Sequence, residues 1–497
     1  MNRLLCVLLH HNPYGDKREG QTTGEQSNRM NREHVLNDFF APGSIALFGS
    51  MKENEFFGAG VIISDLLKGG YRGAIYPVHP SADTAYGIRV YSRLQDIDTV
   101  PELAVIVTSH RNVPEILHQC GHQGVKSVIV VSDGFGEIGP EGEKRQEKLL
   151  QIAESYGIRI IGTNTVGIFN AADAISAVPY DRGYEYSGTE GLSIIAQTGM
   201  CSPQAMAWNE YHPGVNKVIN LGNMSDVDET DCLEYLGEDD GTTVISMYIE
   251  HSRRPRALKE TARRVSTKKP ILCLKPGISP GAATAMASHT GSLAGNETLY
   301  RGLFNQSGII RVEEYEGLRD CATPFLRYPL PRGNRLGVIT FSGAIGIQCI
   351  DTAEASGLTL GALSEASTQF LMRINPSLGG HPVDVGPASA TAGEGLLTMY
   401  RQAFDLLAAD GNIDCLYVNT YLSHIVRPEY YDGLLKHIGA FRDKPVVAWA
   451  YGTSGRLVEE FGVLAESHGI PFFFTTRKAI RSLGYMARYS VWKRSAS

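Results

Sequence analysis

The chain has 497 residues, which is too many for a single hydrophobic core and predicts about three domains of roughly 100–200 residues each. Hydrophobic residues make up 43% of the sequence and charged residues 20%, a balance typical of globular proteins. The formal net charge of −7 and the pI of about 6.1 provide no general basic surface, so we exclude nucleic acid as the main partner.

The first 40 residues show little hydrophobic periodicity, and we predict that residues 1–40 form a disordered or extended tail. Met30 offers an alternative start, so whether residues 1–29 belong to the native protein stays open. The apolar run 4–9 is shorter than a signal-peptide core or a membrane span. The eight cysteines form no C-x-x-C pair and favour reduced, buried thiols. We therefore expect a cytoplasmic protein without a membrane segment.

Residues 41–175 alternate short apolar runs with helix-length segments. The runs at 45–48, 75–78, 103–107 and 127–131 do not alternate with polar residues, which indicates strands covered on both faces. This pattern predicts an α/β domain with a doubly wound, Rossmann-like parallel sheet. Ligands of such sheets bind at the carboxyl ends of the strands.

The first strand-to-helix turn of this region is rich in small residues. It reads Gly49, Ser50, Met51 and Lys52, with Gly58 further on, and predicts a phosphate cradle of backbone N–H groups at a helix start. The G-x-G-x-x-G fingerprint is missing, which disfavours a nicotinamide-dependent oxidoreductase. A tight turn without a ligand is the alternative interpretation.

Residues 185–325 repeat the same strand and helix alternation. The strand 192–196 leads into Gln197, Thr198 and Gly199 and then a helix through 205–208, which predicts either an anion site or a plain helix cap. The strand 244–250 ends in Glu250, an acid that can orient an imidazole or simply face solvent.

Residues 279–296 look least like ordinary structure. Thirteen of these eighteen residues are Gly, Ala, Ser or Thr, and His289 is the one imidazole among them. A segment with so little apolar area contributes little to a hydrophobic core. We therefore expect a mobile or closely approached loop. The absence of a second ligand at metal-binding spacing argues against a metal site, and no metal is expected. A surface loop that happens to carry a histidine is the alternative.

Residues 335–497 repeat the α/β pattern once more, after a boundary rich in proline and glycine at 322–336. The strand 336–340 leads into Ser342, Gly343 and Ala344, which resembles the small-residue helix start at 198–199. Further strands are predicted at 415–418 and 446–449. Two such helix starts aimed at one site would hold a phosphoryl group better than either alone.

The string from Ala287 to Gly295 resembles the phosphohistidine loop of the nucleoside-diphosphate-forming acyl-CoA synthetases, which include succinyl-CoA synthetase and ADP-forming acetate:CoA ligase. The segments 49–51, 76–80, 132–135 and 162–168 are similar to the CoA-binding domain of that family, with departures at ligand-facing positions. The resemblance implies a Rossmann-like CoA-binding domain followed by two flavodoxin-like ligase domains. It identifies His289 as the nucleophile that carries the phosphoryl group and Glu250 as the acid that orients it.

The resemblance also implies two sets of ligand contacts. For the phosphoryl group the residues are Gln197, Thr198, Gly199, Gly291, Ser292, Ser342, Gly343 and Ala344. For CoA they are Gly49, Ser50, Met51, Gly58, Pro80, Thr108, Ser132, Gly134 and Asn164.

The sequence contains neither a Walker A pattern nor a plausible ATP-grasp region. The family resemblance then implies an α-type subunit that joins a carboxylic acid to CoA with a separate ATP-grasp β-type partner in a hetero-oligomer. ATP or ADP with Mg²⁺ is expected on that partner. The altered segments 49–51 and 162–165 keep open a competing hypothesis, a CoA-binding regulatory or scaffold protein without turnover. The identity of the acid, the choice of ATP or GTP, the stoichiometry and the physiological direction stay open.

Overall fold

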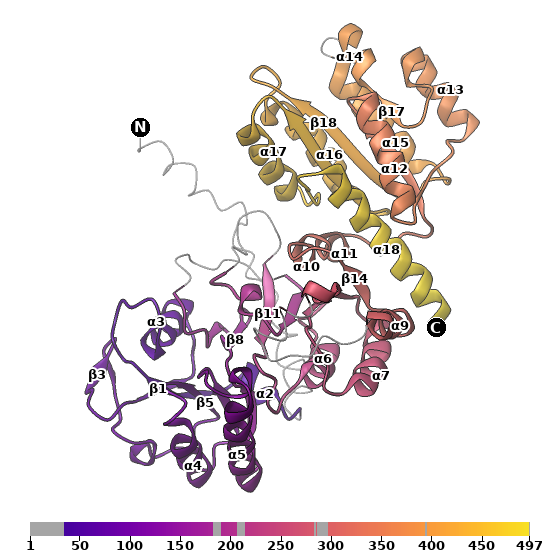
Figure 1. Ribbon diagram of the computed structural model, residues 1–497. Helices are drawn as coiled ribbons and strands as arrows, with labels where there is room; N and C mark the ends of the chain where they lie inside the picture. Colours follow the sequence, from indigo (N-terminus) through magenta and orange to yellow (C-terminus); the bar gives the residue numbers. More distant parts are fainter. Residues whose placement is uncertain are drawn as a thin grey trace.

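The computed structural model describes residues 34–181, 190–205, 214–282, 285, 297–392 and 395–496. Within these segments the chain forms three large sheets, which Figure 1 shows as a lower left part, a lower right part and an upper part. A small hairpin of β3 (Thr84–Ala85) and β4 (Ile88–Arg89) contacts the first sheet through β2.

The first sheet has the strand order β2-β1-β5-β6-β7, and all neighbouring strands are parallel. Its strands are β1 (Ser44–Gly49), β2 (Ala74–Val78), β5 (Leu103–Val107), β6 (Ser127–Val130) and β7 (Arg159–Gly162). The connecting helices are α3 (Ala59–Gly69), α4 (Val113–Gln123) and α5 (Pro140–Tyr156). Because the strands carry apolar residues on both faces, both faces are covered and buried, and the predicted doubly wound sheet is confirmed.

The second sheet has the order β14-β13-β12-β10-β11-β8-β9. Five parallel strands form its body: β10 (Leu192–Ala196), β11 (Val215–Asn220), β12 (Val244–Tyr248), β13 (Ile271–Leu274) and β14 (Ile310–Val312). The antiparallel strands β8 (Ile168–Asn170) and β9 (Ile175–Ser176) extend one edge. The main helices are α6 (Glu229–Glu238), α7 (Pro255–Ser266) and α9 (Glu297–Ser307). The chain thus joins this sheet at Ile168, ahead of the boundary predicted at 175.

The third sheet is parallel, with the order β16-β15-β18-β19 and β17 paired to β15. Its strands are β15 (Arg335–Thr340), β16 (Thr359–Leu360), β17 (Val383–Asp384), β18 (Cys415–Leu422) and β19 (Val446–Gly452). Its helices are α12 (Gly343–Ala355), α13 (Glu365–Ile374), α14 (Gly386–Ala392), α15 (Leu396–Ala409), α16 (Asp432–Ala440) and α17 (Gly455–Ser467). The strands predicted at 336–340, 415–418 and 446–449 are confirmed.

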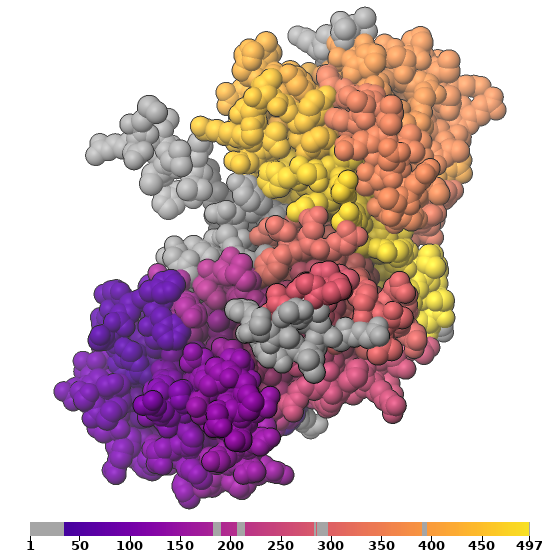
Figure 2. All heavy atoms as spheres, viewed as in Figure 1, coloured from indigo at the N-terminus to yellow at the C-terminus, as the bar shows by residue number. Residues whose placement is uncertain are grey.

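A long helix, α18 (Thr476–Ala496), fastens the third sheet to the second. Figures 1 and 2 show it leaving the upper part and running down the side of the lower right part. It packs against α12, its Tyr489 hydroxyl donates to the Ser266 carbonyl at 2.6 Å, and Arg481 lies 2.7 Å from Glu313. The short helices α10 (Gly317–Asp320) and α11 (Thr323–Arg327) lie between β14 and β15, so part of the predicted boundary is helical.

The described end of the predicted N-terminal tail is packed rather than extended. Residues 37–40 form α2 (Asn37–Phe40), and the side chains of Leu36, Phe39 and Phe40 are fully buried. The Phe40 ring stacks on Tyr235 of α6 at a centroid distance of 4.5 Å. This apolar contact with the second sheet's helix corrects the tail prediction for these residues.

The seven cysteines within the described segments are free and buried, which confirms the prediction for those positions. Among the helices of the described segments, none combines the length and the hydropathy that a bilayer span requires.

Replacing Arg327 with Ala is expected to weaken the joint between the second and third sheets. Its Nη2 lies 3.0 Å from Glu190 Oε1 and 3.9 Å from Oε2 of Glu466, whose pKa is raised to about 8 by burial. Because the change removes the charge-assisted hydrogen bond to the half-buried Glu190, we expect a loss of about 1–3 kcal/mol in unfolding free energy. Urea unfolding checks this against the exposed control Arg332→Ala, and equal effects of the two changes would contradict it.

Candidate functional site

A cleft of about 880 Å³ opens at the carboxyl edge of the first sheet. It is lined by residues that follow β1, β2 and β5, and these include five of the predicted CoA contacts: Gly49, Ser50, Met51, Pro80 and Thr108. The turn after β1 runs to Gly58, and α3 begins at Ala59. Gly58 caps that helix, and a Cβ atom there would lie 3.4 Å from the Ser50 Cβ, so Gly58 supports the cleft from behind.

Close backbone packing explains two glycines at this edge. Gly49 has a φ of +147°, and an added Cβ would lie 2.2 Å from the Val107 carbonyl oxygen. A Cβ on Gly60 would lie 2.3 Å from the Lys52 carbonyl oxygen. Larger residues at these positions would push the loop away from the strand ends, so glycine lets the backbone line the cleft.

Three cationic side chains line this cleft, and the sequence interpretation named none of them as contacts. Lys52 pairs with Glu55 at 3.3 Å and Arg93 with Asp96 at 3.0 Å. Within the described segments no ion pair is found for Arg111, which stands at the start of α4. The Arg111 guanidinium is thus available to an anionic ligand. The sequence could have indicated this contact, because Arg111 lies after a strand end and two residues before a helix.

A second cleft of about 330 Å³ lies next to the first one, and Thr108 lines both. Ser132 and Asn164, two further predicted CoA contacts, lie in its wall. Gly134 lines neither cleft, and its N–H donates to Glu137 Oε1 at 2.5 Å. The structure therefore brings seven of the nine predicted CoA residues together in the lining of the two clefts. The other two, Gly58 and Gly134, line neither cleft.

The segment 162–167 joins the carboxyl edges of the first two sheets. The Thr163 N–H donates to Ser225 Oγ at 3.0 Å, and Thr165 Oγ1 donates to the Asn220 carbonyl at 2.6 Å. Asn164 has a φ of 53°, and its N–H donates to the Ser132 carbonyl. The carboxyl edge of the first sheet, where the clefts lie, thus faces the carboxyl edge of the second sheet.

Gln197 follows β10 and ties it to the end of β12. Its Oε1 accepts from the backbone N–H groups of Glu250 and His251, and its Nε2 donates to the His251 carbonyl at 3.0 Å. The side chain predicted to hold a phosphoryl group is therefore engaged with backbone. Within the described segments the N–H groups of Thr198 and Gly199 have no protein acceptor, so these two donors remain for an anion.

The helix predicted after Gly199 differs from the structure. Gly199–Cys201 form one 3₁₀ turn, capped by Thr198 Oγ1, and the chain to Ala205 is turn. Residues 206–208 of the predicted helix lie outside the described segments. The local anion attraction thus comes from two N–H groups and not from a described long helix.

Glu250 lies just past β12, and its side chain is 8% exposed. Lys275, which follows β13 and is 3% exposed, lies close enough for the Glu250 charge to raise its pKa. Burial and, secondarily, Arg311 outweigh this and hold the pKa of Lys275 below its ordinary value. Lys275 Nζ also stands over the Tyr300 ring at 4.8 Å. The sequence interpretation missed this buried cation, although a lysine at a strand end before the histidine loop was visible.

His289, Gly291 and Ser292 lie outside the described segments, so their predicted roles stay predictions. Arg311 contacts a described residue on each side of that segment. Its guanidinium donates to the Lys275 carbonyl at 3.4 Å and to Glu297 Oε2 at 3.0 Å. Lys275, which precedes the histidine by fourteen positions, and Glu297, which follows it by eight, are therefore held beside one arginine.

The helix start in the third sheet is confirmed. α12 begins at Gly343 with Ser342 as its N-cap, and Gly343 and Ala344 are exposed. Their N–H groups belong to the first turn, which has no acceptor within the helix. Asp384 stands beside this start, 3.3 Å from where a Cβ of Gly343 would lie. The role of this start in binding a phosphoryl group stays a prediction.

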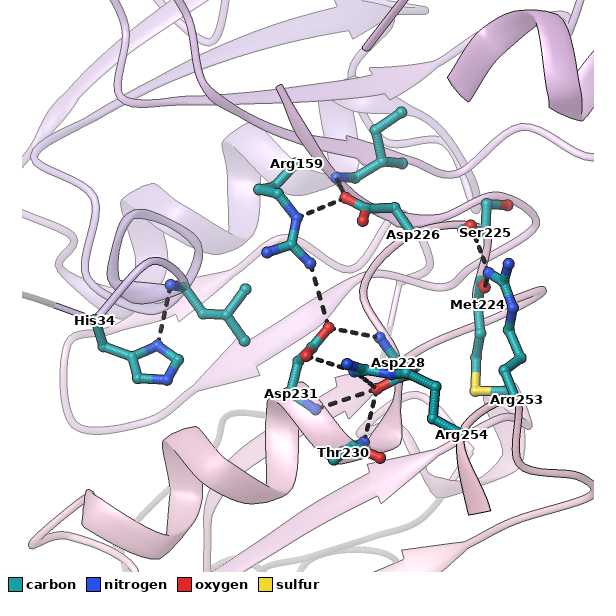
Figure 3. Close-up of polar contacts among 12 residues, drawn as sticks. His34, Arg159, Met224, Ser225, Asp226, Asp228, Thr230, Asp231, Arg253 and Arg254 are labelled. Carbon is teal, nitrogen blue, oxygen red and sulfur yellow. Dashed lines mark hydrogen bonds and ion pairs between the residues drawn. The ribbon is translucent and has the colours of Figure 1, made fainter. Parts of the chain in front are cut away.

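Figure 3 explains the two arginines that follow Ser252. Arg254 forms a bidentate pair with Asp228, the N-cap of α6, and also contacts Asp231 at 2.6 Å. Arg253 donates to the carbonyls of Met224 and Ser225. Burial alone would raise the pKa of Asp228, but the Arg254 hydrogen bonds outweigh that effect and lower it.

The same cluster connects the first two sheets. Arg159, at the start of β7, donates to Asp226 at 2.8 Å and to Asp231 at 3.2 Å, and the Ile160 N–H donates to Asp226. These contacts hold the loop after β11 in place, and with it Asn223 and Ser225, which meet the segment 162–167.

No group of three or more potential metal ligands occurs in the part of the chain that the structure describes.

The comparisons with known proteins match this arrangement. Residues 43–171 match the model of a CoA binding domain, and residues 189–325 match that of a succinyl-CoA ligase like flavodoxin domain. The α subunit of acetate–CoA ligase [ADP-forming] I from Pyrococcus furiosus is 33% identical over 92% of this chain and 98% of its own length. The chain belongs to the α-subunit family of ADP-forming acyl-CoA ligases. The predicted family and its α/β fold are thus confirmed.

Two further relatives bear on the extent of the chain. Acetate–CoA ligase [ADP-forming] I of Archaeoglobus fulgidus is 31% identical over 91% of this chain, which spans 63% of that longer protein. The structure of the dinucleotide forming acetyl-coenzyme A synthetase 1 of Ca. Korarchaeum cryptofilum, in complex with phosphate and ADP, superposes with a TM-score of 0.84. It is 28% identical, and the match covers 93% of this chain and 98% of that one.

Replacing Arg111 with Ala is expected to weaken CoA binding. A charge-assisted hydrogen bond to phosphate contributes about 1.5–3 kcal/mol, so we expect at least a tenfold higher Kd. Calorimetric titration of CoA checks this, with Arg72→Ala at the opposite edge of the sheet as the control. An unchanged Kd would contradict the assignment.

Replacing Glu229 with Gln is expected to flatten the pH dependence of stability. Burial raises the pKa of Glu229 from 4.5 to about 7, the Ser252 hydroxyl offsets part of this and Asp228 adds to it. Between these values the folded state holds a proton that the unfolded state has lost, so stability falls as pH rises from about 4.5 to 7. Urea unfolding at pH 5 and pH 8 should show this loss reduced by roughly 1–3 kcal/mol in the variant. The exposed control Glu234→Gln should keep the wild-type slope, and an unchanged slope in Glu229→Gln would refute the expectation.

Proposed function

We propose that this chain is the α-type subunit of an ADP-forming acid:CoA ligase and that it works with a separate ATP-grasp β-type subunit. The observation that carries the proposal is that the parts of the site lie next to each other. The cleft of the first sheet shares Thr108 with the second cleft, and Val166 in that second cleft lies 3.0 Å from where a Cβ of Gly199 would be. A CoA thiol and a phosphoryl group could therefore meet at the junction of the two sheets.

The residues of the first cleft fit CoA. Arg111, Lys52 and Arg93 provide positive charge for its phosphates, and the glycine-supported backbone after β1 permits close approach. The narrower second cleft suits the uncharged arm that ends in the thiol. We assign CoA contacts to the predicted residues that line these clefts, with Gly58 and Gly134 in supporting positions.

The reaction proceeds in two transfers. A carboxylate oxygen of the acid attacks the phosphorus on His289, the P–N bond breaks, and its electron pair returns to the ring nitrogen, which leaves an acyl phosphate. The CoA sulfur then attacks the acyl carbon, the bond from carbon to the bridging oxygen breaks, and inorganic phosphate leaves with the thiol proton. Glu250 orients His289, and the N–H groups of Thr198 and Gly199 stabilise the phosphoryl charge. Gly291, Ser292 and the α12 start at Ser342, Gly343 and Ala344 complete the phosphoryl contacts in this proposal.

The nucleotide belongs to the partner. ATP or ADP with Mg²⁺ would bind on the ATP-grasp chain, and the phosphoryl group would pass between that site and His289. The division of relatives into named α subunits and longer single chains supports this arrangement. We also propose that the assembly is a hetero-oligomer of the cytoplasm and that the three sheets, with boundaries near those predicted, are its domains.

Phosphoryl transfer tests the proposal. Purified chain, its ATP-grasp partner, Mg²⁺ and γ-labelled ATP should give a label on this chain that is acid-labile and base-stable, as phosphohistidine is. His289→Asn should abolish the label, whereas the control His437→Asn on α16 should retain it. Absence of label on the wild-type chain with every acid and nucleotide tried would favour the CoA-binding scaffold instead.

A further inference from the structure

The second cleft has an unusual lining for a site between two anionic ligands. Phe57, Tyr180, Val107, Val131 and Val166 form apolar walls, and among the residues that the structure describes no lysine, arginine or histidine lines it. The carboxylate of Asp133 stands in its wall. A second negative charge on a ligand would therefore meet an acid and no cation from the described part of the chain.

The polar groups of this cleft are already bonded to protein. Ser132 Oγ donates to the Thr108 carbonyl at 2.6 Å, and Thr165 Oγ1 donates to the Asn220 carbonyl at 2.6 Å. Asn164 donates from its backbone to Ser132 and from its side chain to Asn223. Because these donors are engaged, they are less available to a ligand, and the aromatic and valine side chains provide the apolar part of the lining.

The two aromatic rings are held by the main chain. Phe57 and Tyr180 form an antiparallel bridge, flanked by hydrogen bonds from the Gly58 N–H to the Pro179 carbonyl at 2.9 Å and from the Asp181 N–H to the Phe56 carbonyl at 3.0 Å. Their ring centroids lie 4.8 Å apart at an interplanar angle of 55°. A ring pair fixed in this way offers a preformed face for a flat apolar group.

We propose that this cleft is an acyl pocket that selects an aromatic monocarboxylic acid, with Phe57 and Tyr180 as specificity-determining residues. The inference rests on the proposed function, because the acyl carbon has to lie between the CoA thiol and the phosphoryl group. Thr108 and Val166 place this cleft between those two positions. The second carboxylate of a dicarboxylic acid would be repelled by Asp133, which lines the cleft.

A comparison of substrates tests the proposal, with the full chain and its ATP-grasp partner as the enzyme. Acyl-CoA formation is measured separately with phenylacetate, acetate and succinate. We expect kcat/KM for phenylacetate to exceed that for acetate at least tenfold, since burial of a ring adds far more apolar contact than a methyl group. Turnover of acetate or succinate in preference to phenylacetate would overturn the inference and leave the proposed function standing. Turnover of no acid at all would contradict the proposed function itself.

Variants separate a specificity role from a structural one. Phe57→Ala and Tyr180→Ala should each lower the ratio of kcat/KM for phenylacetate to that for acetate by about tenfold, mainly through KM. Phe57→Leu, which keeps an apolar side chain of similar reach, should restore part of that ratio. The control Phe370→Ala, at a 40% exposed position on α13, should leave the ratio unchanged. An equal loss for both acids in the two alanine variants would show that the rings only support the fold, and would overturn the assignment.

Discussion

The facing of two carboxyl edges is the constraint on which the site depends. A parallel sheet concentrates strand ends and helix starts at one edge, and a single sheet offers one such edge to a ligand. Here the segment 162–167 leaves the first sheet and is bonded at once to Asn220 and Ser225 of the second. Arg159, at the start of β7, also joins the two sheets through its hydrogen bond to Asp226. The carboxyl edges of the two sheets are thus held against each other by direct hydrogen bonds.

Much of the fold was predictable because its signals are local. Apolar runs that do not alternate marked the strands of all three sheets, and small residues after a strand marked Gly49 and the start of α12. The burial of α2 was not predictable, since it depends on Tyr235, which is distant in the sequence. The crossing of the chain into the second sheet at β8 depends likewise on pairing with β11.

The candidate site was predictable in outline and less so in its side chains. Glycine positions and strand ends follow from local conformation, so most predicted CoA contacts share two adjacent clefts. The engagement of Gln197 with the backbone after β12 and the freedom of Arg111 both depend on neighbours brought in by the fold. The pairing of Phe57 with Tyr180 joins residues far apart in the chain and leaves no local pattern.

The clamp that Arg311 makes on Lys275 and Glu297 sets a geometric limit on phosphoryl exchange. His289 lies eight positions before Glu297 in the sequence. A fully extended chain covers 3.3–3.6 Å per residue, so the imidazole-bearing Cα can travel no farther than about 26–29 Å from that anchor. Under the proposed function, a nucleotide on a partner chain would have to come within this distance plus the reach of the His289 side chain. The number of residues between His289 and Glu297 thus limits how far apart the two can lie. Each residue inserted or deleted between them would change this maximum distance by one residue length.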